Sequence, residues 1–340
     1  SADRTYRRWC GGNYFPHPHF EGVQIMRITK LWMIYLIVIC LAVCFLFLNS
    51  GLDFDYVIPN RLLRLATIVI AGICVAFSSI VFQTLVGNRI LTPSIMGYEA
   101  IYLLWQVLLL FFWGTHGLSQ LGVNGNFFIS IVLMLLYSWV IHKWLLPYGR
   151  NDVFLLLLLG LVLTMVVGTV TQFIQLKINP GEFSVFQGLS YASFNRSQPE
   201  TLFYASLAVV IVLFLGRKAL PVLDVLVLGR EQAISLGIDH HRYVSFYLAL
   251  IAILVAVSTS LIGPTVFMGV FIANITYALA RSYKHKLTLP IGCAITIAIF
   301  IAAQILVEHV FNYKTTVSIL VNLVCGIYFL ALTVRTRGVA

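Results

Sequence analysis

The sequence predicts an all-α fold, a polytopic bundle of about ten transmembrane helices. Hydrophobic residues make up 60% of the 340 residues and charged residues only 10%, and so few charges cannot cover the surface of a soluble domain. The apolar residues form runs whose lengths are close to the roughly 20 residues that a helix needs to cross the hydrocarbon core. The lipid bilayer is therefore expected to be the main solvent of this chain.

Each apolar run is predicted to be one helix. The runs cover residues 31–48, 62–86, 95–113, 127–146, 153–176, 202–215, 243–262, 266–280, 287–310 and 316–334. The sixth and eighth are short, and the pair Gly263-Pro264 breaks any helix that reaches it. Broken segments are tolerated at membrane depth only where protein or a water-filled cavity surrounds them.

The N-terminal 25 residues differ from the rest of the chain. They are polar, aromatic and proline-bearing, and they contain no apolar core of a signal peptide. We expect residues 1–25 to form a flexible extension and residues 26–340 to form one transmembrane domain.

The positive charges indicate how the helices are oriented. Ten spans place both ends of the chain on one side of the membrane. If that side is the cytoplasm, 5 of the 22 Lys and Arg residues lie outside and the remaining 17 lie inside, as the positive-inside rule requires. The net charge of +10 is confined to loops and forms no basic helix with interleaved aromatics, so nucleic acid is not an expected partner.

The sequence contains no pattern for chemistry of its own. It has no Walker A motif, no HExxH motif and no nucleophile beside a base. Its six cysteines fit neither metal-binding pairs nor a disulfide framework. We therefore expect no catalytic residue, no metal site and no cofactor on this chain, which argues against an integral membrane enzyme.

The longest loop with a helical pattern, residues 217–242, joins the sixth and seventh predicted helices. Residues 230–236 are predicted to form two turns, with Glu231 near the positive N-terminal end and Gly237 as a left-handed cap. The small residues Gly229 and Ala233 and the apolar Leu236 suit a helix that docks into a groove of another protein. A helix lying on the lipid surface is the alternative.

This loop carries a family resemblance. The run LGREQAISLGIDHHR, residues 228–242, resembles the "LG-[DE]-x-A-x-x-LG" signature of the FecCD-type family, the permeases of bacterial ABC importers for iron-siderophores, heme and cobalamin. In that family the loop forms coupling helices that sit on the ATPase subunit. The resemblance therefore implies that an ATPase partner contacts Gly229, Glu231, Ala233, Leu236 and Gly237.

Two more stretches resemble the family in the same order along the chain. The first, RLLRLATIVIAGICVAFSSIVFQTLVGNRILTPSIMG, begins at residue 61, and the second, STSLIGPTVFMGVFIANITYALA, begins at residue 258. The matching positions are Arg61, Arg64, Gly72, Gln83, Asn88, Pro93, Gly97, Gly263, Phe267, Gly269 and Asn274. Leu63, Ile90 and Ala273 stand where the family has proline. Together with residues 182–195, these departures make the chain resemble the catecholate-siderophore branch most.

The resemblance implies a type II ABC importer permease in the bacterial cytoplasmic (inner) membrane. Its expected partners are an ATPase subunit that binds ATP and Mg, a second permease subunit and a periplasmic siderophore-binding protein. A heterodimer of permeases is favoured over a homodimer. The expected cargo is a ferric siderophore of catecholate type, with heme or cobalamin as alternatives.

The same resemblance implies roles for individual residues. Arg61 and Arg64, at the outer end of the second helix, are expected to dock the binding protein, although lipid head groups are the alternative partners. Thr171 and Gln175 share one face of the fifth helix and are candidates for the translocation pathway, with interhelical packing as the alternative. Gln83 fits either role.

An ion-coupled secondary transporter is the rival from another class. It predicts internal repeats and buried carboxylates, and the sequence has no convincing repeat. Glu99, Glu308 and His309 are the candidates for a proton relay. We expect each of them near a span end, where water reaches it.

Overall fold

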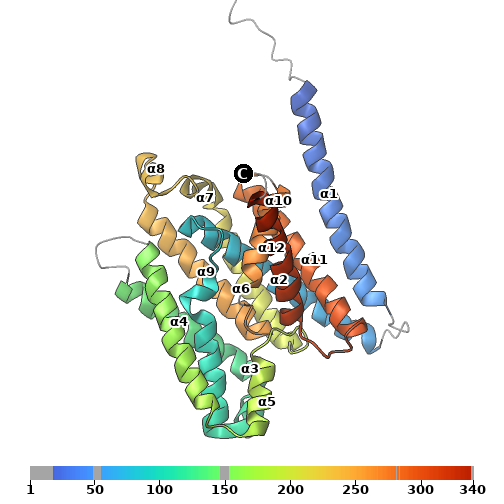
Figure 1. Ribbon diagram of the computed structural model, residues 1–340, viewed down its shortest axis with the longest axis vertical. Coiled ribbons are helices and arrows are strands. Elements are labelled where there is room, and N and C mark those ends of the chain that lie inside the picture. The colour runs from blue at the N-terminus through green and yellow to red at the C-terminus, as the bar shows by residue number, and fades with distance from the viewer. Residues whose placement is uncertain are drawn as a thin grey trace, which may run out of the picture.

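The computed structural model of the chain describes residues 18–48, 55–145, 153–265, 267–280, 282 and 284–337. Within these ranges it is all-helical, with twelve α-helices, one short 3-10 helix and no strand (Figure 1). The elements are α1 (Pro18–Phe47), α2 (Val57–Val86), η2 (Pro93–Met96), α3 (Tyr98–Leu145), α4 (Val153–Gln175), α5 (Pro180–Leu189), α6 (Pro199–Arg217), α7 (Leu220–Leu226), α8 (Arg230–Ser235), α9 (His240–Ile262), α10 (Met268–Ala280), α11 (His285–His309) and α12 (Val317–Arg337).

The predicted helix bundle is confirmed, and every predicted run is largely helical. The third and fourth runs both belong to α3, which Gly114 and Gly122 interrupt with φ angles of 60° and 65°. The two halves run antiparallel, because Trp105 and Gln106 of the first half hydrogen-bond Asn126 of the second. Within the described ranges, six helices are long and apolar enough to cross a membrane.

Two expectations about boundaries are wrong. The sixth predicted helix is not short, since α6 extends over 19 residues. Residues 95–97 belong not to a long helix but to η2 and Gly97, whose left-handed φ of 87° turns the chain into α3. The flexible extension over residues 1–25 stays a prediction, because residues 1–17 lie outside the described part of the chain and residues 18–25 form the start of α1.

Helix α5 was not anticipated, although the sequence carries a signal for it. Asn179 and Glu182 form a capping box in which each side chain pairs with the backbone of the other, and Pro180 occupies the first turn. This combination is a known start signal for a helix. Helix α5 packs on α3 at one end of the bundle.

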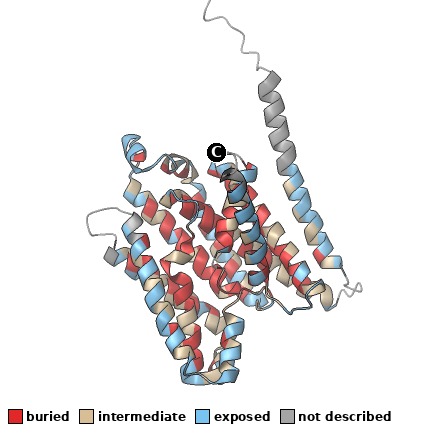
Figure 2. Ribbon diagram, in the orientation of Figure 1, coloured by how far each residue is buried: buried red, intermediate tan, exposed pale blue. Residues whose placement is uncertain are grey.

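Helices α2 and α9 form the centre of the molecule. In each of them 72% of the most apolar window is buried, and both pack against α6 as well as each other, while α3 and α11 cover them further. Figure 2 shows the buried residues concentrated along these central helices. Small residues allow the close approach: a Cβ on Gly72 would lie 2.9 Å from Ile297 Cγ1 of α11.

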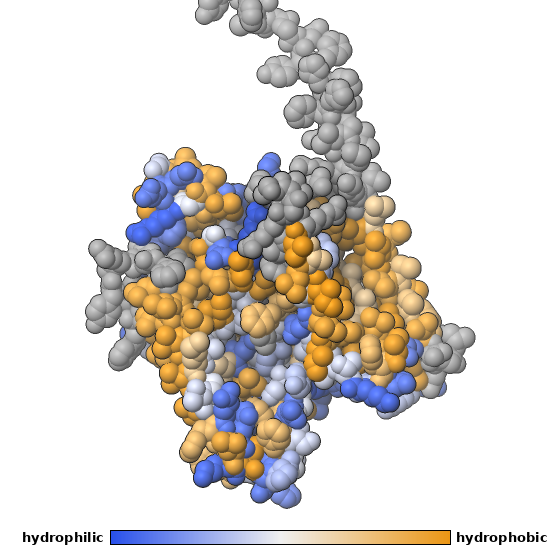
Figure 3. Space-filling view, in the orientation of Figure 1, coloured by the Kyte–Doolittle hydropathy of each residue, from blue (hydrophilic) through white to orange (hydrophobic). Residues whose placement is uncertain are grey.

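The outer helices present apolar side chains outward. Examples are Trp32 of α1, Met165 of α4, Phe203 of α6 and Val334 of α12, all more than half exposed. In Figure 3 an apolar band crosses the visible face, with hydrophilic side chains toward both ends. A soluble protein rarely exposes so large an apolar area, whereas the acyl chains of a bilayer would cover it.

The two ends of the bundle carry different elements. Helices α7 and α8, the start of α1 and the C-terminus lie at one end, called here the α8 end, and α5 and the turn within α3 lie at the other, the α5 end (Figure 1). The described chain thus begins and finishes at the same end, as ten spans require.

Candidate coupling helix and transport residues

Helix α8 has the predicted left-handed cap. Its C-terminus is a Schellman motif, because the Ile238 amide donates to Ala233 O at 3.1 Å and the Gly237 amide donates to Ile234 O at 2.9 Å. Gly237 has the left-handed φ of 80° that this motif needs, and Gly229, just before the helix, has a φ of 100°. Both glycines therefore stand where a side chain would strain the backbone.

The side chains of α8 divide into an inner and an outer set. Ala233 is fully buried and anchors the helix, while Glu231 is exposed. Ile234 and Leu236 are 52% and 63% exposed, although both are apolar. Since α8 packs mainly on α7 and α9, an acidic and apolar surface at the α8 end remains available to another protein.

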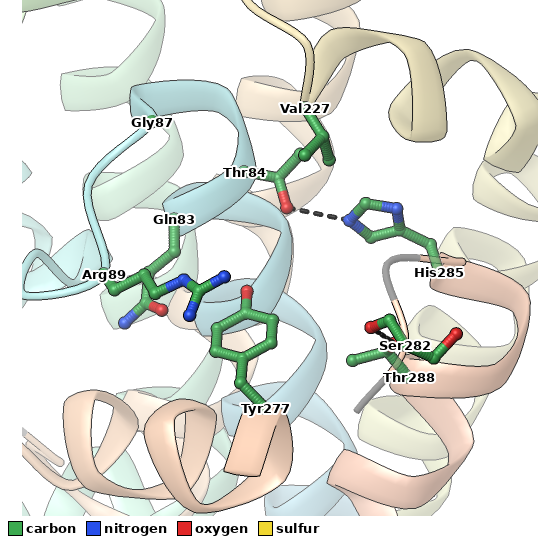
Figure 4. Close-up of a pocket in the computed structure, with 9 residues that line it drawn as sticks. All are labelled: Gln83, Thr84, Gly87, Arg89, Val227, Tyr277, Ser282, His285 and Thr288. Atoms are coloured by element: carbon green, nitrogen blue, oxygen red, sulfur yellow. Dashed lines mark hydrogen bonds between the residues drawn. The ribbon is translucent and has the colours of Figure 1, made fainter. Parts of the chain in front are cut away.

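A polar cavity of about 200 Å³ lies beneath α7 at the α8 end (Figure 4). Its walls come from α2, α10 and α11, from the connections that follow α2 and α10, and from the residue after α7. The lining residues are Gln83, Thr84, Gly87, Arg89, Val227, Tyr277, Ser282, His285 and Thr288. Arg89 stacks on the Tyr277 ring with its guanidinium carbon 4.8 Å from the ring centroid. The structure thus places Gln83, a pathway candidate, on the wall of a cavity inside one chain, where it is 2% exposed.

Arg61 has a structural role that the sequence did not reveal. Its guanidinium donates hydrogen bonds to the carbonyls of Phe45 at 2.8 Å and Leu48 at 2.6 Å. These are terminal carbonyls of α1, which have no partner within the helix. Arg61 is only 9% exposed, so it caps α1 and ties it to α2.

Arg64 forms an ion pair at the same end of α2. Its Nη1 lies 3.0 Å from Glu308 Oε1 of α11, and the arginine side chain is 31% exposed while the glutamate is 6% exposed. Gln304 donates to the same carboxylate oxygen at 2.7 Å. Arg64 is therefore the more accessible of the two candidate docking arginines.

The two candidate pathway residues on α4 differ in exposure. Thr171 is 4% exposed, and its hydroxyl donates to Val167 O of the same helix at 2.8 Å. Gln175, one turn further, is half-buried. Helix α4 packs on α3 and η2, so Thr171 lies within the chain, while the assignment of either residue to the pathway stays a prediction.

Glu99, Glu308 and His309 lie at helix ends, as predicted, but the expectation that water reaches them is wrong for Glu99. Glu99 is 7% exposed, and its Oε1 accepts hydrogen bonds from the Thr265 amide at 2.9 Å and the Thr265 hydroxyl at 3.0 Å. It thereby joins the start of α3 to the segment between α9 and α10. Glu308 and His309 are half-buried, and both carboxylates have partners, as burial of a charge requires. Among the described residues there is no cluster of three or more His, Cys, Asp or Glu that could hold a metal ion.

The bundle, its short broken helices and its exposed apolar side chains are those of a multi-pass membrane protein. A family model for the FecCD transport family matches residues 47–335. The chain belongs to this family.

Individual relatives support this family assignment. The petrobactin import system permease protein YclO of Bacillus subtilis is 36% identical over 310 residues, covering 91% of this chain and 97% of that protein. The petrobactin import system permease protein FatC of Bacillus anthracis is 32% identical, covering 84% of this chain and 81% of that protein. YclN, also a petrobactin import system permease protein of Bacillus subtilis, is 23% identical over 92% of this chain and all of its own length.

Solved structures share the fold. An inward-facing conformation of a metal-chelate type ABC transporter superposes with a TM-score of 0.79 at 18% identity, covering 90% of this chain and 99% of that chain. PsaBC from Streptococcus pneumoniae superposes with a TM-score of 0.52 at 14% identity, covering 83% and 92%. At such identities the likeness concerns the fold alone.

Proposed function

We propose that this chain is the membrane-spanning permease subunit of an ABC importer that carries a ferric siderophore, petrobactin in the first instance, across the bacterial cytoplasmic membrane. The observation that carries the proposal is the 36% identity to a petrobactin permease over nearly the whole of both chains. A heme permease is the weaker alternative, because the hemin permease HmuU of Yersinia pestis is only 24% identical over 82% of this chain.

The energy comes from a separate ATPase subunit, which holds the ATP and Mg and sits on α8. The exposed Glu231, Ile234 and Leu236 support this docking, since a short helix with an apolar and charged outer surface fits a groove on another protein. ATP binding and hydrolysis then shift the permease between outward-facing and inward-facing states, and the contact that differs between the states lies at α8.

The second permease is a different chain. In Bacillus subtilis two petrobactin import permeases exist, and this chain is 36% identical to one and 23% identical to the other. The pair FatC and FatD of Bacillus anthracis gives the same contrast, 32% against 24%. A partner similar to YclN and FatD would complete the pathway, and a homodimer is the alternative.

A siderophore-binding protein delivers the cargo at the α5 end. Arg64 supports such docking better than Arg61, because its side chain is 31% exposed while Arg61 is buried against α1. In this arrangement the α8 end and both chain ends face the cytoplasm, which agrees with the excess of Lys and Arg in the loops on that side.

Uptake of radiolabelled iron tests the cargo. Cells that lack their own petrobactin permeases are supplied with this chain, its partner permease, the ATPase and the binding protein. We expect uptake of iron from petrobactin, and none from a hydroxamate siderophore or heme. Uptake from heme alone would contradict the siderophore assignment.

Two substitutions in α8 test the coupling. Glu231→Arg reverses an exposed charge, and Ala233→Asp places a carboxylate where the structure has a fully buried methyl group. We expect both to abolish uptake and transport-linked ATP hydrolysis while membrane insertion is retained. Lys286→Glu, a charge reversal at an exposed position of the same end, is the control and should transport normally. Normal uptake by both α8 variants would refute the coupling role.

A further inference from the structure

Three polar side chains from three helices form a continuous chain of hydrogen bonds at the α8 end. His285, the first residue of α11, has its Nδ1 2.7 Å from Asp224 Oδ1 of α7 and its Nε2 2.8 Å from Thr84 Oγ1 of α2, a contact drawn in Figure 4. The carboxylate can only accept, so Nδ1 carries a proton and donates it. The Thr84 hydroxyl also lies 3.0 Å from Ile80 O of its own helix.

Asp224 additionally caps α11 from a different helix. The backbone amide of His285 donates to Asp224 Oδ1 at 2.8 Å. The residue at the N-cap of α11, Lys284, makes no side-chain cap bond. The first amides of a helix need an external partner, and a carboxylate there also interacts favourably with the helix dipole. One carboxylate oxygen thus holds both the backbone and the ring of His285.

Helix α7 connects α8 to α2 and α11, beside the direct contact of α8 with α9. Helix α8 packs mainly on α7 and α9, and α7 in turn packs on α2 and α11. The apolar part of this contact comes from Leu223 and Leu226, which are 0% and 5% exposed. Apolar contacts are non-directional and resist sliding weakly, whereas hydrogen bonds fix distance and angle.

Asp224 is the only polar side chain in α7, whose sequence is LPVLDVL. The polar cavity described above lies beside the chain of hydrogen bonds, and Thr84, His285 and Val227 line it. Beside the cavity, few packed side chains hold the end of α7 against α2. Gln83, on the same wall, has no hydrogen-bond partner for its amide and does not restrain α7.

We propose that Asp224, His285 and Thr84 are positioning residues that make α7 and α8 move with α2 and α11 as one unit. When the ATPase displaces α8, the movement would then be transmitted through α7 to α2 and α11. Without these hydrogen bonds α7 would shift relative to α2 and α11, and the two helices would stay in place. This proposal rests on the proposed function, because it describes how the motion of α8 is transmitted. None of the three residues needs to touch the cargo or the ATPase.

The test uses the complete transporter in proteoliposomes and measures both ATP hydrolysis and siderophore transport. Asp224→Ala removes the link to α11, and Thr84→Val removes the link to α2. We expect Asp224→Ala to lower the amount of siderophore transported per ATP hydrolysed about tenfold, as the loss of a hydrogen bond to a charged group implies. Thr84→Val loses a hydrogen bond to the imidazole and should lower the same ratio by a smaller factor. ATP hydrolysis continues in both variants. Asp224→Asn keeps an acceptor oxygen and should retain much of the coupling.

Thr169→Val is the matched control for Thr84→Val. Thr169 is exposed on α4, and its hydroxyl donates to Met165 O four residues earlier. Thr84 makes the corresponding bond to Ile80 O, so the two substitutions differ in the contact to His285. We expect the Thr169 variant to transport as the unaltered chain does.

Hydrogen exchange in lipid nanodiscs gives a second readout. In the Asp224→Ala variant the amides of residues 220–238 should exchange faster, while those of the central part of α2 are unchanged. Unchanged transport per ATP in both Asp224→Ala and Thr84→Val would overturn the proposal. So would an equal loss of hydrolysis and transport together with loss of the ATPase from the complex, because the residues would then serve assembly alone. An unaltered chain that neither binds an ATPase nor transports would instead overturn the proposed function.

Discussion

Charged side chains inside this bundle are satisfied by partners from the same chain. Arg61 caps the carbonyls at the end of α1, Glu99 accepts from both polar hydrogens of Thr265, and Glu308 pairs with Arg64. In hydrocarbon an unpartnered charge would cost several kcal/mol. The carboxylates that a proton relay would use therefore have structural partners.

The pair of Arg64 and Glu308 yields a prediction at the residue scale. Arg64→Ala leaves the carboxylate of Glu308, 6% exposed, without its cation, and we expect a loss of about 1–3 kcal/mol in stability. A lower Tm in detergent measures it. Adding Glu308→Gln removes the stranded charge and should restore most of the Tm. An unchanged Tm in Arg64→Ala would show that the pair contributes nothing.

The same two variants separate stability from docking. If Arg64 also binds the siderophore-binding protein, the double variant regains its Tm but not its affinity for that protein. Recovery of both properties would exclude the docking role.

At the scale of elements, the short helix α10 depends on close contact with α2. It begins after Gly263-Pro264, and Gly269 in its first turn lies against α2: a Cβ there would overlap Ser79 Oγ and lie 3.0 Å from Ser79 Cβ. A methyl group therefore fits only if Ser79 shifts. The position of α10 against α2 therefore depends on residue 269 being a glycine.

Gly269→Ala is expected to destabilise the protein by about 1–3 kcal/mol, the usual cost of overpacking. Gly168→Ala is the matched control, because a Cβ on Gly168 of α4 would meet nothing within 4 Å. Thermal unfolding in detergent should show a lower Tm for the first variant and not for the second. Combining Gly269→Ala with Ser79→Ala removes the closest atom and should restore part of the loss; equal Tm values for the two glycine variants would contradict this packing.

At the scale of the whole molecule, the start of α1 and the end of α12 lie at the α8 end (Figure 1). The sequence assigns this end to the cytoplasm by the distribution of Lys and Arg. A membrane protein with the opposite orientation could not present α8 to a cytoplasmic ATPase. Orientation and function are therefore tested together.

Cysteine labelling in intact cells measures the orientation. In a background without the native cysteines, Gln232→Cys in α8 and Ser119→Cys in the turn within α3 are both exposed. We expect a membrane-impermeant maleimide to modify the Ser119 variant from outside and to reach the Gln232 variant only after the membrane is opened. Labelling of the Gln232 variant in intact cells would overturn both the orientation and the coupling role of α8.

Local patterns explain what could be predicted without the structure. The helical runs follow from the length and apolar character of each segment and the cap of α8 from Gly237, because each depends on residues close together in the chain. The orientation inferred from loop charges stays a prediction. Helix α5 belongs to the same group, since its capping box is local.

The tertiary structure alone decided which polar groups meet. Asp224 and His285 are 61 residues apart, Thr84 and His285 are 201 apart, and Arg64 and Glu308 are 244 apart. No spacing or periodicity relates residues at such separations. Their contacts depend on how the helices pack, and helix packing is the collective result of every small and large side chain along α2, α7 and α11.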